Sequence, residues 1–192
     1  YTTLFRSDKV IRISRVYGTY DFPADFMLCA AMNPCPCGHY PDMNRCRCTP
    51  AQVMQYLGRI SQPLLDRLDL CAEVSPVDFE GLSSGRKGES TQTIRERVIC
   101  AQDIQRERYK IEGIQFNGEL SGAQIEKYCK MEKDARQLLK MAFRNMPFSA
   151  RAYHRILKVA RTIADMEATE SIHRHHIAEA LSYRAFDKKY WN

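Results

Sequence analysis

Four cysteines crowd into one fourteen-residue segment, as Cys35, Cys37, Cys46 and Cys48. Two Cys-x-Cys pairs separated by eight residues can place four thiolates tetrahedrally around one ion at about 2.3 Å. Such a set leaves no open coordination position, so we expect a structural metal site. Zn²⁺ is the default ion for four sulfurs, and an iron–sulfur cluster is the weaker option. His39 in place of one cysteine, and reduced thiols without a metal, remain alternatives.

The remaining cysteines are Cys29, Cys71, Cys100 and Cys129. They are scattered among apolar neighbours, which is typical of small residues that fill a core. The N-terminal segment has no apolar signal core, and the chain has no run of about 18 apolar residues. We therefore expect a cytoplasmic protein without a membrane span. In that compartment a tight cysteine cluster indicates a metal rather than disulfides.

The charge is distributed unevenly along the chain. Residues 1–80 carry 8 Lys/Arg and 9 Asp/Glu, whereas residues 81–192 carry 21 Lys/Arg and 14 Asp/Glu. The second part therefore has a formal charge of +7, against −1 for the first. An anionic partner such as nucleic acid or a nucleotide fits this balance, and a solvated helical surface is the simpler interpretation.

The first part of the chain has the pattern of an α/β domain. Alternation over residues 10–16 predicts a half-buried strand, and residues 19–22 can return as a second strand after Gly18. The apolar run 26–31 predicts a buried central strand. Thr49, Pro50 and Gln52 indicate the start of a helix that reaches about Ile60, and residues 68–74 predict another strand.

Residues 81–93 are polar and rich in Gly and Ser, which predicts a linker between residues 1–80 and residues 94–192. Everything after the linker has a helical pattern. We expect helices over 94–110, 121–128, 132–145 and about 173–184, and Ser149 caps the longest one. The predicted fold class is thus an α/β piece followed by an all-α domain.

Three polar residues occupy positions at which a phosphate-binding site needs them. Asn33 closes the predicted strand 26–31, where it could orient an attacking water, and Arg67 lies on a rigid corner just before the next strand. Arg151 lies in the first turn of the long helix. The simpler interpretations are that Asn33 is a turn residue and that Arg67 pairs with Asp66 or Asp69. The chain contains no G-x-x-x-x-G-K-[ST] motif.

Three segments, residues 13–38, 46–70 and 149–165, closely resemble the magnesium-chelatase-like AAA+ ATPases of the ComM (YifB) type. The resemblance extends from about Lys9 to Arg184, and Asn-Pro-Cys-Pro-Cys-Gly and Cys-Arg-Cys-Thr-Pro-Ala-Gln are its most specific pieces. It implies the C-terminal part of an AAA+ P-loop core with a four-cysteine knuckle over residues 1–80, followed by a helical lid domain over residues 94–192.

The same resemblance implies roles for individual residues. Asn33 matches the sensor-1 position, Arg67 matches an arginine finger that acts across a ring interface, and Arg151 matches the sensor-2 arginine of the lid. The hairpin over residues 10–22 resembles a pore hairpin, so Arg12 and Arg15 are candidate DNA contacts.

Members of this family are bacterial, form hexameric rings on DNA and act as ATP-driven branch-migration motors linked to natural transformation. The resemblance therefore implies ATP with Mg²⁺ in the full-length protein, structural Zn²⁺, DNA, and copies of the same chain as partners. Rotation of the lid about residues 81–93 would couple nucleotide state to ring geometry.

The Walker A and Walker B segments and a Lon-protease-like domain should precede this chain in the family. We therefore interpret the chain as a C-terminal fragment that does not hydrolyse ATP alone. The family pattern fails before about Asp8, which suggests that Tyr1–Ser7 are foreign to it.

Two other functions are carried as alternatives: a non-enzymatic zinc-containing DNA-binding module, and the motor subunit of a true magnesium chelatase. The cysteine segment argues against the second. His173, His175 and His176 could suggest a further metal, but at the start of a surface helix we expect them to be solvated.

Overall fold

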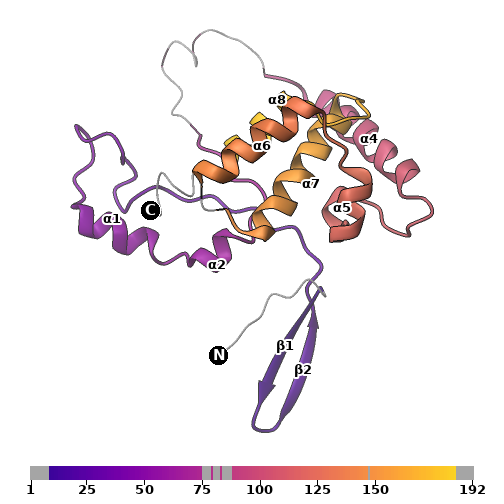
Figure 1. The fold of residues 1–192 in the computed structure, drawn as a ribbon. Coiled ribbons are helices and arrows are strands. Elements are labelled where there is room, and N and C mark those ends of the chain that lie inside the picture. Colours follow the sequence, from indigo (N-terminus) through magenta and orange to yellow (C-terminus); the bar gives the residue numbers. More distant parts are fainter. Residues whose placement is uncertain (1–8, 75–78, 80–82, 84–87, 147, 185–192) are drawn as a thin grey trace. The chain divides into compact units, whose positions relative to one another are not determined.

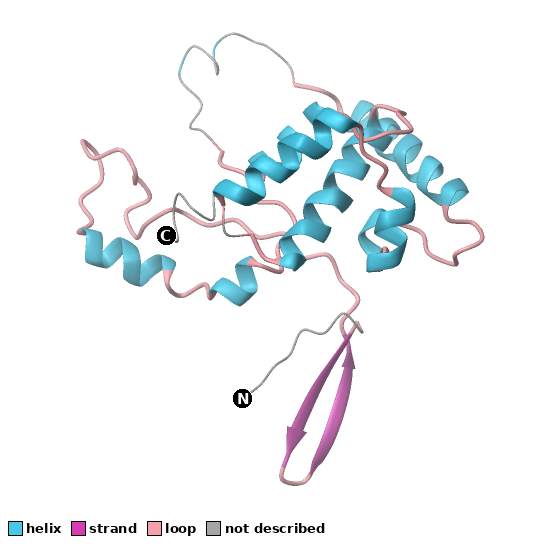
Figure 2. Cartoon of the chain, in the orientation of Figure 1, coloured by secondary structure: helices cyan, strands magenta, loops and turns pink. Residues whose placement is uncertain are grey.

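The computed structural model describes residues 9–74, 79, 83, 88–146 and 148–184. The chain divides into two compact units, Tyr1–Cys48 and Thr49–Asn192 (Figure 1). The first unit contains a β-hairpin and the cysteine loop, and the second contains helices (Figure 2).

The hairpin consists of β1 (Val10–Arg15) and β2 (Gly18–Pro23), which pair antiparallel with Arg15 opposite Gly18 and Val10 opposite Pro23. Val16 and Tyr17 form its two-residue tip and are 94% and 95% exposed. Both predicted strands are therefore present. The expectation of a half-buried strand is met only at its start, because Val10 and Ile11 are partly buried whereas Ile13 is exposed. In β2, Tyr20 and Phe22 are exposed as well.

The predicted central strand over residues 26–31 is not formed, and Phe26, Met27 and Leu28 are exposed coil. The strand predicted over residues 68–74 is coil as well. A buried strand needs hydrogen-bonded neighbours on both sides. In the described part of the chain β1 and β2 pair only with each other, so neither segment has such a neighbour.

Two short helices open the second unit. Helix α1 (Pro50–Leu57) begins with a capping box, in which the Thr49 hydroxyl accepts the Gln52 N–H and the Gln52 side chain accepts the Thr49 N–H. Pro50 suits the first turn, where its missing N–H costs nothing. Helix α2 (Gln62–Leu65) follows after Ser61, and Leu65 is buried.

The rest of the second unit is helical, and its elements are α4 (Thr91–Arg108), the 3₁₀ turn η1 (Asn117–Glu119), α5 (Gly122–Tyr128), α6 (Lys133–Asn145), α7 (Ala150–Met166) and α8 (Arg174–Ser182). Ser90 caps α4 and Ser149 caps α7, each accepting a backbone N–H three residues later. Of the predicted linker 81–93, the structure describes residues 83 and 88–93, and Thr91–Thr93 form the first turn of α4.

Helix α7 is the centre of the hydrophobic core. It contacts α4, α5, α8 and η1, while α6 packs against α8. Its apolar residues recur every three or four positions and face inward, as the sequence pattern predicts; Ile156, Leu157, Ala160 and Ala164 are all buried. Among the described helices, none is both long enough and apolar enough to cross a membrane.

Candidate functional site

The four clustered cysteines converge at one point of the first unit. Their sulfur atoms all lie within 4.8 Å of one another. The distances are 3.4 Å from Cys35 to Cys37, 3.8 Å from Cys35 to Cys46 and 3.6 Å from Cys37 to Cys46. Tetrahedral sulfurs about 2.3 Å from a central ion are about 3.8 Å apart. The cluster therefore has the size and chemistry of a four-thiolate metal site.

Local backbone geometry positions these sulfurs. The Gly38 N–H donates to the Cys35 carbonyl, and Gly38 has a φ of +82°, which a side chain would strain. The Cys46 N–H donates to the Asp42 carbonyl, which closes the second turn. Tyr40 donates its N–H to the Cys35 sulfur at 3.4 Å. Backbone donors of this kind orient and stabilise thiolate ligands.

The electrostatics of the loop favour a bound cation. The N–H groups of His39 and Arg47 lower the pKa of Cys37 to about 6. The Cys48 N–H lowers the pKa of Cys46, but desolvation and the sulfurs of Cys37 and Cys35 outweigh it and raise that pKa to about 12. Without a cation, four neighbouring sulfurs cannot all ionise. A metal ion removes that conflict.

The cysteines outside the cluster differ from the expectation of core filling. Only Cys129 is buried, within the helical core, whereas Cys29 and Cys100 are exposed and Cys71 is partly buried.

Asn33 and the hairpin arginines lie in the same unit as the cluster. Asn33 is exposed. Its side-chain amide lies 3.7 Å from the point that a Cβ atom would occupy if Gly38 had a side chain, so Asn33 borders the cysteine loop. Arg12 forms a bidentate ion pair with Asp21 at 2.7 Å, which lowers the pKa of the Asp21 carboxyl. Arg15 is exposed on the same strand. This pair occupies two of the five N–H donors of Arg12.

Arg67 lies in the second unit, directly after α2. Its side chain is exposed, and one guanidinium N–H donates to the Pro63 carbonyl at 2.8 Å. This bond ties one terminal nitrogen of the guanidinium, Nη1, to the preceding helical turn. Arginine has five N–H donors in a rigid fork, so the others can address an anion. The pairing of Arg67 with Asp66 or Asp69 that served as the simpler interpretation is not present.

Two arginines from the helical part hold the segment that carries Arg67. Arg155 donates to the Leu68 carbonyl at 3.2 Å and lies 3.5 Å from the Asp69 carboxylate. Arg184, only 3% exposed, donates to the carbonyls of Leu68 at 2.6 Å and Leu65 at 3.4 Å. Cations at the end of a helix are favourable because its last carbonyls lack intrahelical partners.

Arg151 lies in the first turn of α7, one turn before Arg155, and is exposed. Helical geometry places positions 151 and 155 on one face. Through Arg155 the start of α7 is thus joined to the residue after Arg67. Neither Arg155 nor Arg184 was predicted to hold this segment. The four-residue spacing from Arg151 was the only local signal for Arg155, and nothing local pointed to Arg184.

Of the three histidines expected to be solvated, His176 differs from that expectation. His176 is fully buried, whereas His173 is partly exposed and His175 is exposed. The His173 N–H donates to His176 Nδ1 at 2.9 Å, so His176 Nε2 carries the proton and donates to Glu167 at 3.0 Å. His175 Nε2 contacts the same carboxylate oxygen at 2.9 Å. Although Glu167, His175 and His176 are close enough to hold a metal, His176 has no lone pair left for one. The group caps α8.

The comparisons with known proteins assign the class. A family model described as magnesium chelatase, subunit ChlI, matches residues 6–82, and one described as magnesium chelatase, subunit ChlI C-terminal, matches residues 88–184. The chain therefore belongs to the magnesium chelatase ChlI family.

Individual relatives show which members of this family the chain resembles. The chain is 45% identical to the uncharacterized protein YifB of Salmonella typhimurium over 180 residues, which are 93% of this chain and 34% of that protein. It is 44% identical to the competence protein ComM of Haemophilus influenzae over 176 residues, which are 91% of this chain and 34% of that protein. YifB of Escherichia coli is 42% identical, with the same coverage as the Salmonella protein. The chain spans about a third of the length of these bacterial relatives.

Proposed function

We propose that this chain is the C-terminal portion of a ring-forming, ATP-dependent DNA motor of the ComM type. The observation that carries the proposal is the 44% identity to the competence protein ComM over 91% of this chain. In this proposal residues 1–80 complete an AAA+ core, residues 81–93 form a linker, and residues 94–192 form its helical lid. The chain alone, which has no Walker A motif, does not hydrolyse ATP.

Arg67 acts as the arginine finger. When bound, ATP with Mg²⁺ supplies the phosphoryl group that is transferred to water. Arg67 contributes a fixed positive charge where negative charge develops during that transfer, and it does so at the nucleotide of a neighbouring copy. Its exposure and its single hydrogen bond to Pro63 suit a group that reaches outward.

Arg151 and Asn33 act within their own subunit. Arg151, in the exposed first turn of α7, contacts the nucleotide from the lid, and Asn33 orients the attacking water. Arg155 and Arg184 hold the Arg67 segment against α7 and the end of α8. A movement of the lid at one nucleotide would therefore displace the finger that serves the next one.

A structural zinc ion belongs to the same proposal. Cys35, Cys37, Cys46 and Cys48 would hold it, since their sulfur spacing fits a four-thiolate site. All four positions would be taken by protein, so the ion orders the loop and has no catalytic task. Arg45 and Arg47 lie between the cysteines in sequence and offset the negative charge of four thiolates.

The test uses the whole protein, expressed from the complete gene. Arg67→Ala should lower the rate of ATP hydrolysis by about 10³–10⁵-fold. Nucleotide affinity, measured with a fluorescent ATP analogue, should stay within about threefold, because the finger acts on another subunit's site. Arg59→Ala, an exposed arginine beside α1, is the matched control and should hydrolyse normally. Normal turnover by Arg67→Ala would reject the assignment.

The zinc-containing DNA-binding module remains the second candidate, because α6 carries a run of exposed cations with no carboxylate partner in the described part of the chain. The ATP hydrolysis assay on the whole protein distinguishes the two candidates. A DNA-binding module of this kind binds DNA but shows no ATP hydrolysis that depends on Arg67.

A further inference from the structure

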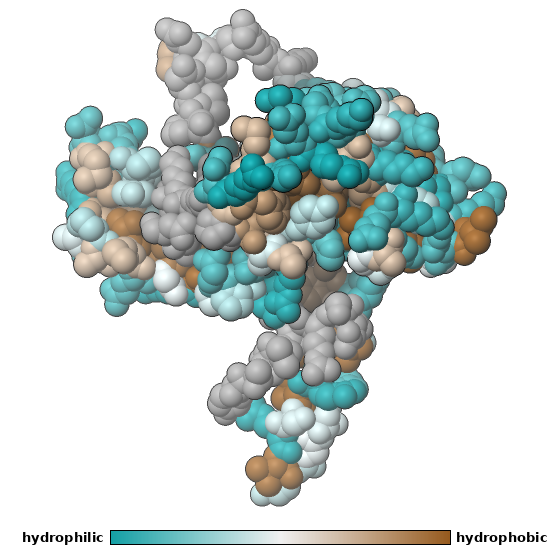
Figure 3. Space-filling model, viewed as in Figure 1, coloured by the Kyte–Doolittle hydropathy of each residue, from teal (hydrophilic) through white to brown (hydrophobic). Residues whose placement is uncertain are grey.

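Helix α6 carries four basic residues on one exposed strip: Lys133, Arg136, Lys140 and Arg144. Their spacing of three, four and four residues places them on one face of the helix. No carboxylate of the described residues forms an ion pair with any of them. Figure 3 shows hydrophilic residues along this helix. We call these four residues the α6 strip.

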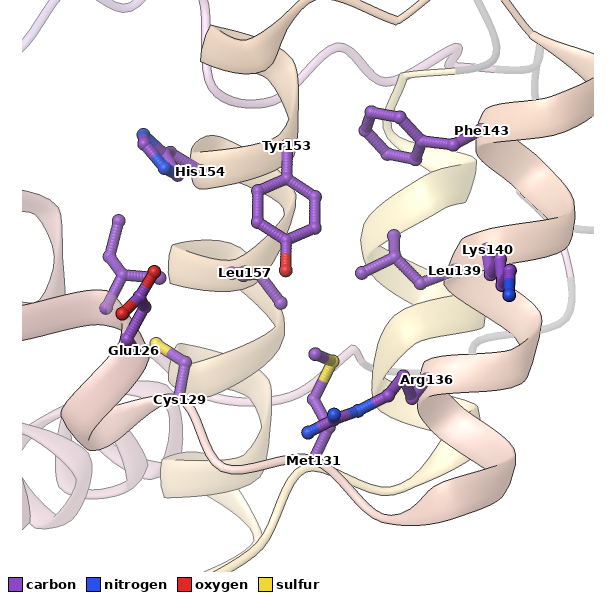
Figure 4. Close-up of a pocket in the computed structure, with 11 residues that line it drawn as sticks. Glu126, Cys129, Met131, Arg136, Leu139, Lys140, Phe143, Tyr153, His154 and Leu157 are labelled. Atoms are coloured by element: carbon purple, nitrogen blue, oxygen red, sulfur yellow. The ribbon is translucent and has the colours of Figure 1, made fainter. Parts of the chain in front are cut away.

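A groove of about 490 Å³ runs beside the strip, between α5, α6 and α7. Arg136 and Lys140 line its α6 side, and Figure 4 shows them on the helix that faces Tyr153 and Leu157. The floor is apolar, because Leu139 and Leu157 are almost fully buried. The groove therefore combines an apolar floor with one cationic wall.

On the α7 wall of the groove, Tyr153 contributes an aromatic ring and a hydroxyl. Tyr153 packs edge-on against Phe143 with ring centroids 5.5 Å apart. Figure 4 shows its hydroxyl directed into the space between α7 and α6. Across the described residues this hydroxyl has no hydrogen-bond partner. A partly buried hydroxyl aimed into a groove is available to a ligand.

The charges on the two walls of the groove indicate which kind of ligand it can bind. The strip extends from Lys133 to Arg144, which is eleven helical steps of 1.5 Å, or about 16 Å. Successive phosphates of one strand are about 3.4 Å apart along a duplex axis, so the strip spans several of them. Glu126 on α5 lines the opposite side of the groove and repels a second anion there. A ligand with regularly spaced anions on one side and flat groups on the other fits both walls.

We propose that the α6 strip and its groove bind a single polynucleotide strand, with phosphates along α6 and a base beside Tyr153. Stacking on aromatic rings next to a basic track is how strands are held without sequence preference. The inference deepens the DNA-binding part of the proposed function, on which it rests. It places a DNA contact on the helical unit. The candidate DNA contacts of the hairpin, Arg12 and Arg15, do not depend on it.

The test is made on the 192-residue chain without ATP. Binding of a fluorescein-labelled oligodeoxythymidylate of about 20 nucleotides, longer than the 4–16-nucleotide sites of known strand-binding folds, is followed by anisotropy at several salt concentrations. Each lost phosphate contact reduces the slope of log K against log salt by about 0.7 for a single strand. Arg136→Gln/Lys140→Gln should therefore reduce the slope by about 1.4 and weaken binding.

The matched control, Arg95→Gln/Lys110→Gln, removes the same charge from exposed positions on and just after α4. It should leave the slope unchanged. Tyr153→Phe keeps the ring contact with Phe143 and removes only the hydroxyl, so it should weaken binding about two- to tenfold with an unchanged slope. Far-ultraviolet circular dichroism of each variant verifies that the helices are intact.

Three results would overturn the inference. Equal losses in the strip variant and in the control would mean that binding follows net charge alone. Displacement of the oligonucleotide by polyglutamate at equal charge concentration would indicate an acidic protein partner. Failure of the wild-type chain to bind the oligonucleotide would also contradict the inference. None of these results touches the Arg67 test, which measures hydrolysis, so failure here is distinguishable from failure of the proposed function.

Discussion

The buried carboxylate of Asp165 accepts hydrogen bonds from three other side chains of the helical unit. Arg108 forms a bidentate pair with it, Arg161 contacts it at 3.1 Å, and Asn117 donates to it at 2.8 Å. Arg161 is itself fully buried and donates to the carbonyls of Thr169 and Glu170. Burial lowers the pKa of Arg161, yet an arginine remains charged, so its pairing with Asp165 matters for stability.

Replacement of Asp165 should be strongly destabilising. Asp165→Asn keeps the volume but leaves Arg161 as a buried cation without a counter-charge, and breaking a buried pair costs about 3–5 kcal/mol. Urea unfolding followed by circular dichroism measures the change. Asp103→Asn is the control, because it removes only an exposed pair with Arg106 and should cost less than about 0.5 kcal/mol. A loss below about 1 kcal/mol for Asp165→Asn would contradict the proposed role of the network.

Glu112 makes stability depend on pH. Hydrogen bonds from Lys127, Tyr128 and Gln124 lower the pKa of its carboxyl from 4.5 to about 2. A carboxylate whose pKa is lower in the folded state stabilises that state above its unfolded pKa and loses this contribution as pH falls through the folded one. The contribution should thus be full above pH 4.5 and lost by about pH 2.

Glu112→Gln, which cannot ionise, isolates that contribution. The difference in unfolding free energy between wild type and Glu112→Gln should be constant near neutral pH and should shrink steadily below pH 4.5. Urea titrations across this range give the difference. A difference that stayed constant down to pH 3 would mean that the Glu112 carboxylate does not stabilise the fold.

At the scale of single elements, local chemistry in the sequence predicted the helices well. Thr49 with Gln52 marks the start of α1, and Ser149 marks the start of α7. Both signals act within one helical turn, so they need no knowledge of the rest of the chain. The hairpin was predictable for the same reason, since its strands are separated by two residues.

Elements and contacts that depend on distant partners were not predictable in this way. The apolar run 26–31 predicts a strand only if other strands flank it, and none does in the described part of the chain. The contact of Arg155 with Leu68 joins residues 87 positions apart, and that of Arg184 with Leu68 joins residues 116 apart. No local pattern encodes such pairs. The cysteine cluster was predictable because its four ligands lie within fourteen residues.

The cysteine loop should lose its order without metal, while the helices remain. The purified chain should contain about one zinc, and chelation should free four thiols. Helical circular dichroism should change little, because the described α-helices all lie between residues 50 and 182, outside the unit that holds the loop. Cys46→Ser should abolish zinc binding, whereas Cys100→Ser, an exposed cysteine in α4, should not. A folded chain that holds no metal and whose four clustered thiols all react without chelation would exclude the site.

At the scale of the whole molecule, the chain covers about a third of its relatives. The proposed ring gives its two key arginines different sites: Arg151 serves the nucleotide of its own subunit, and Arg67 serves that of a neighbour. A heterologous interface repeated around a ring has this property, because each subunit presents two different surfaces. Both arginines are exposed, as such a division requires.

Subunit mixing tests this central claim most directly. In the whole protein, Arg67→Ala and Arg151→Ala should each be almost inactive in ATP hydrolysis. When the two are mixed in equal amounts, about a quarter of the interfaces combine an intact Arg151 with a neighbour's intact Arg67. The mixture should therefore regain a substantial fraction of the wild-type rate. If two differently tagged variants co-purify in one ring and the mixture still hydrolyses no ATP, Arg67 does not act across the interface.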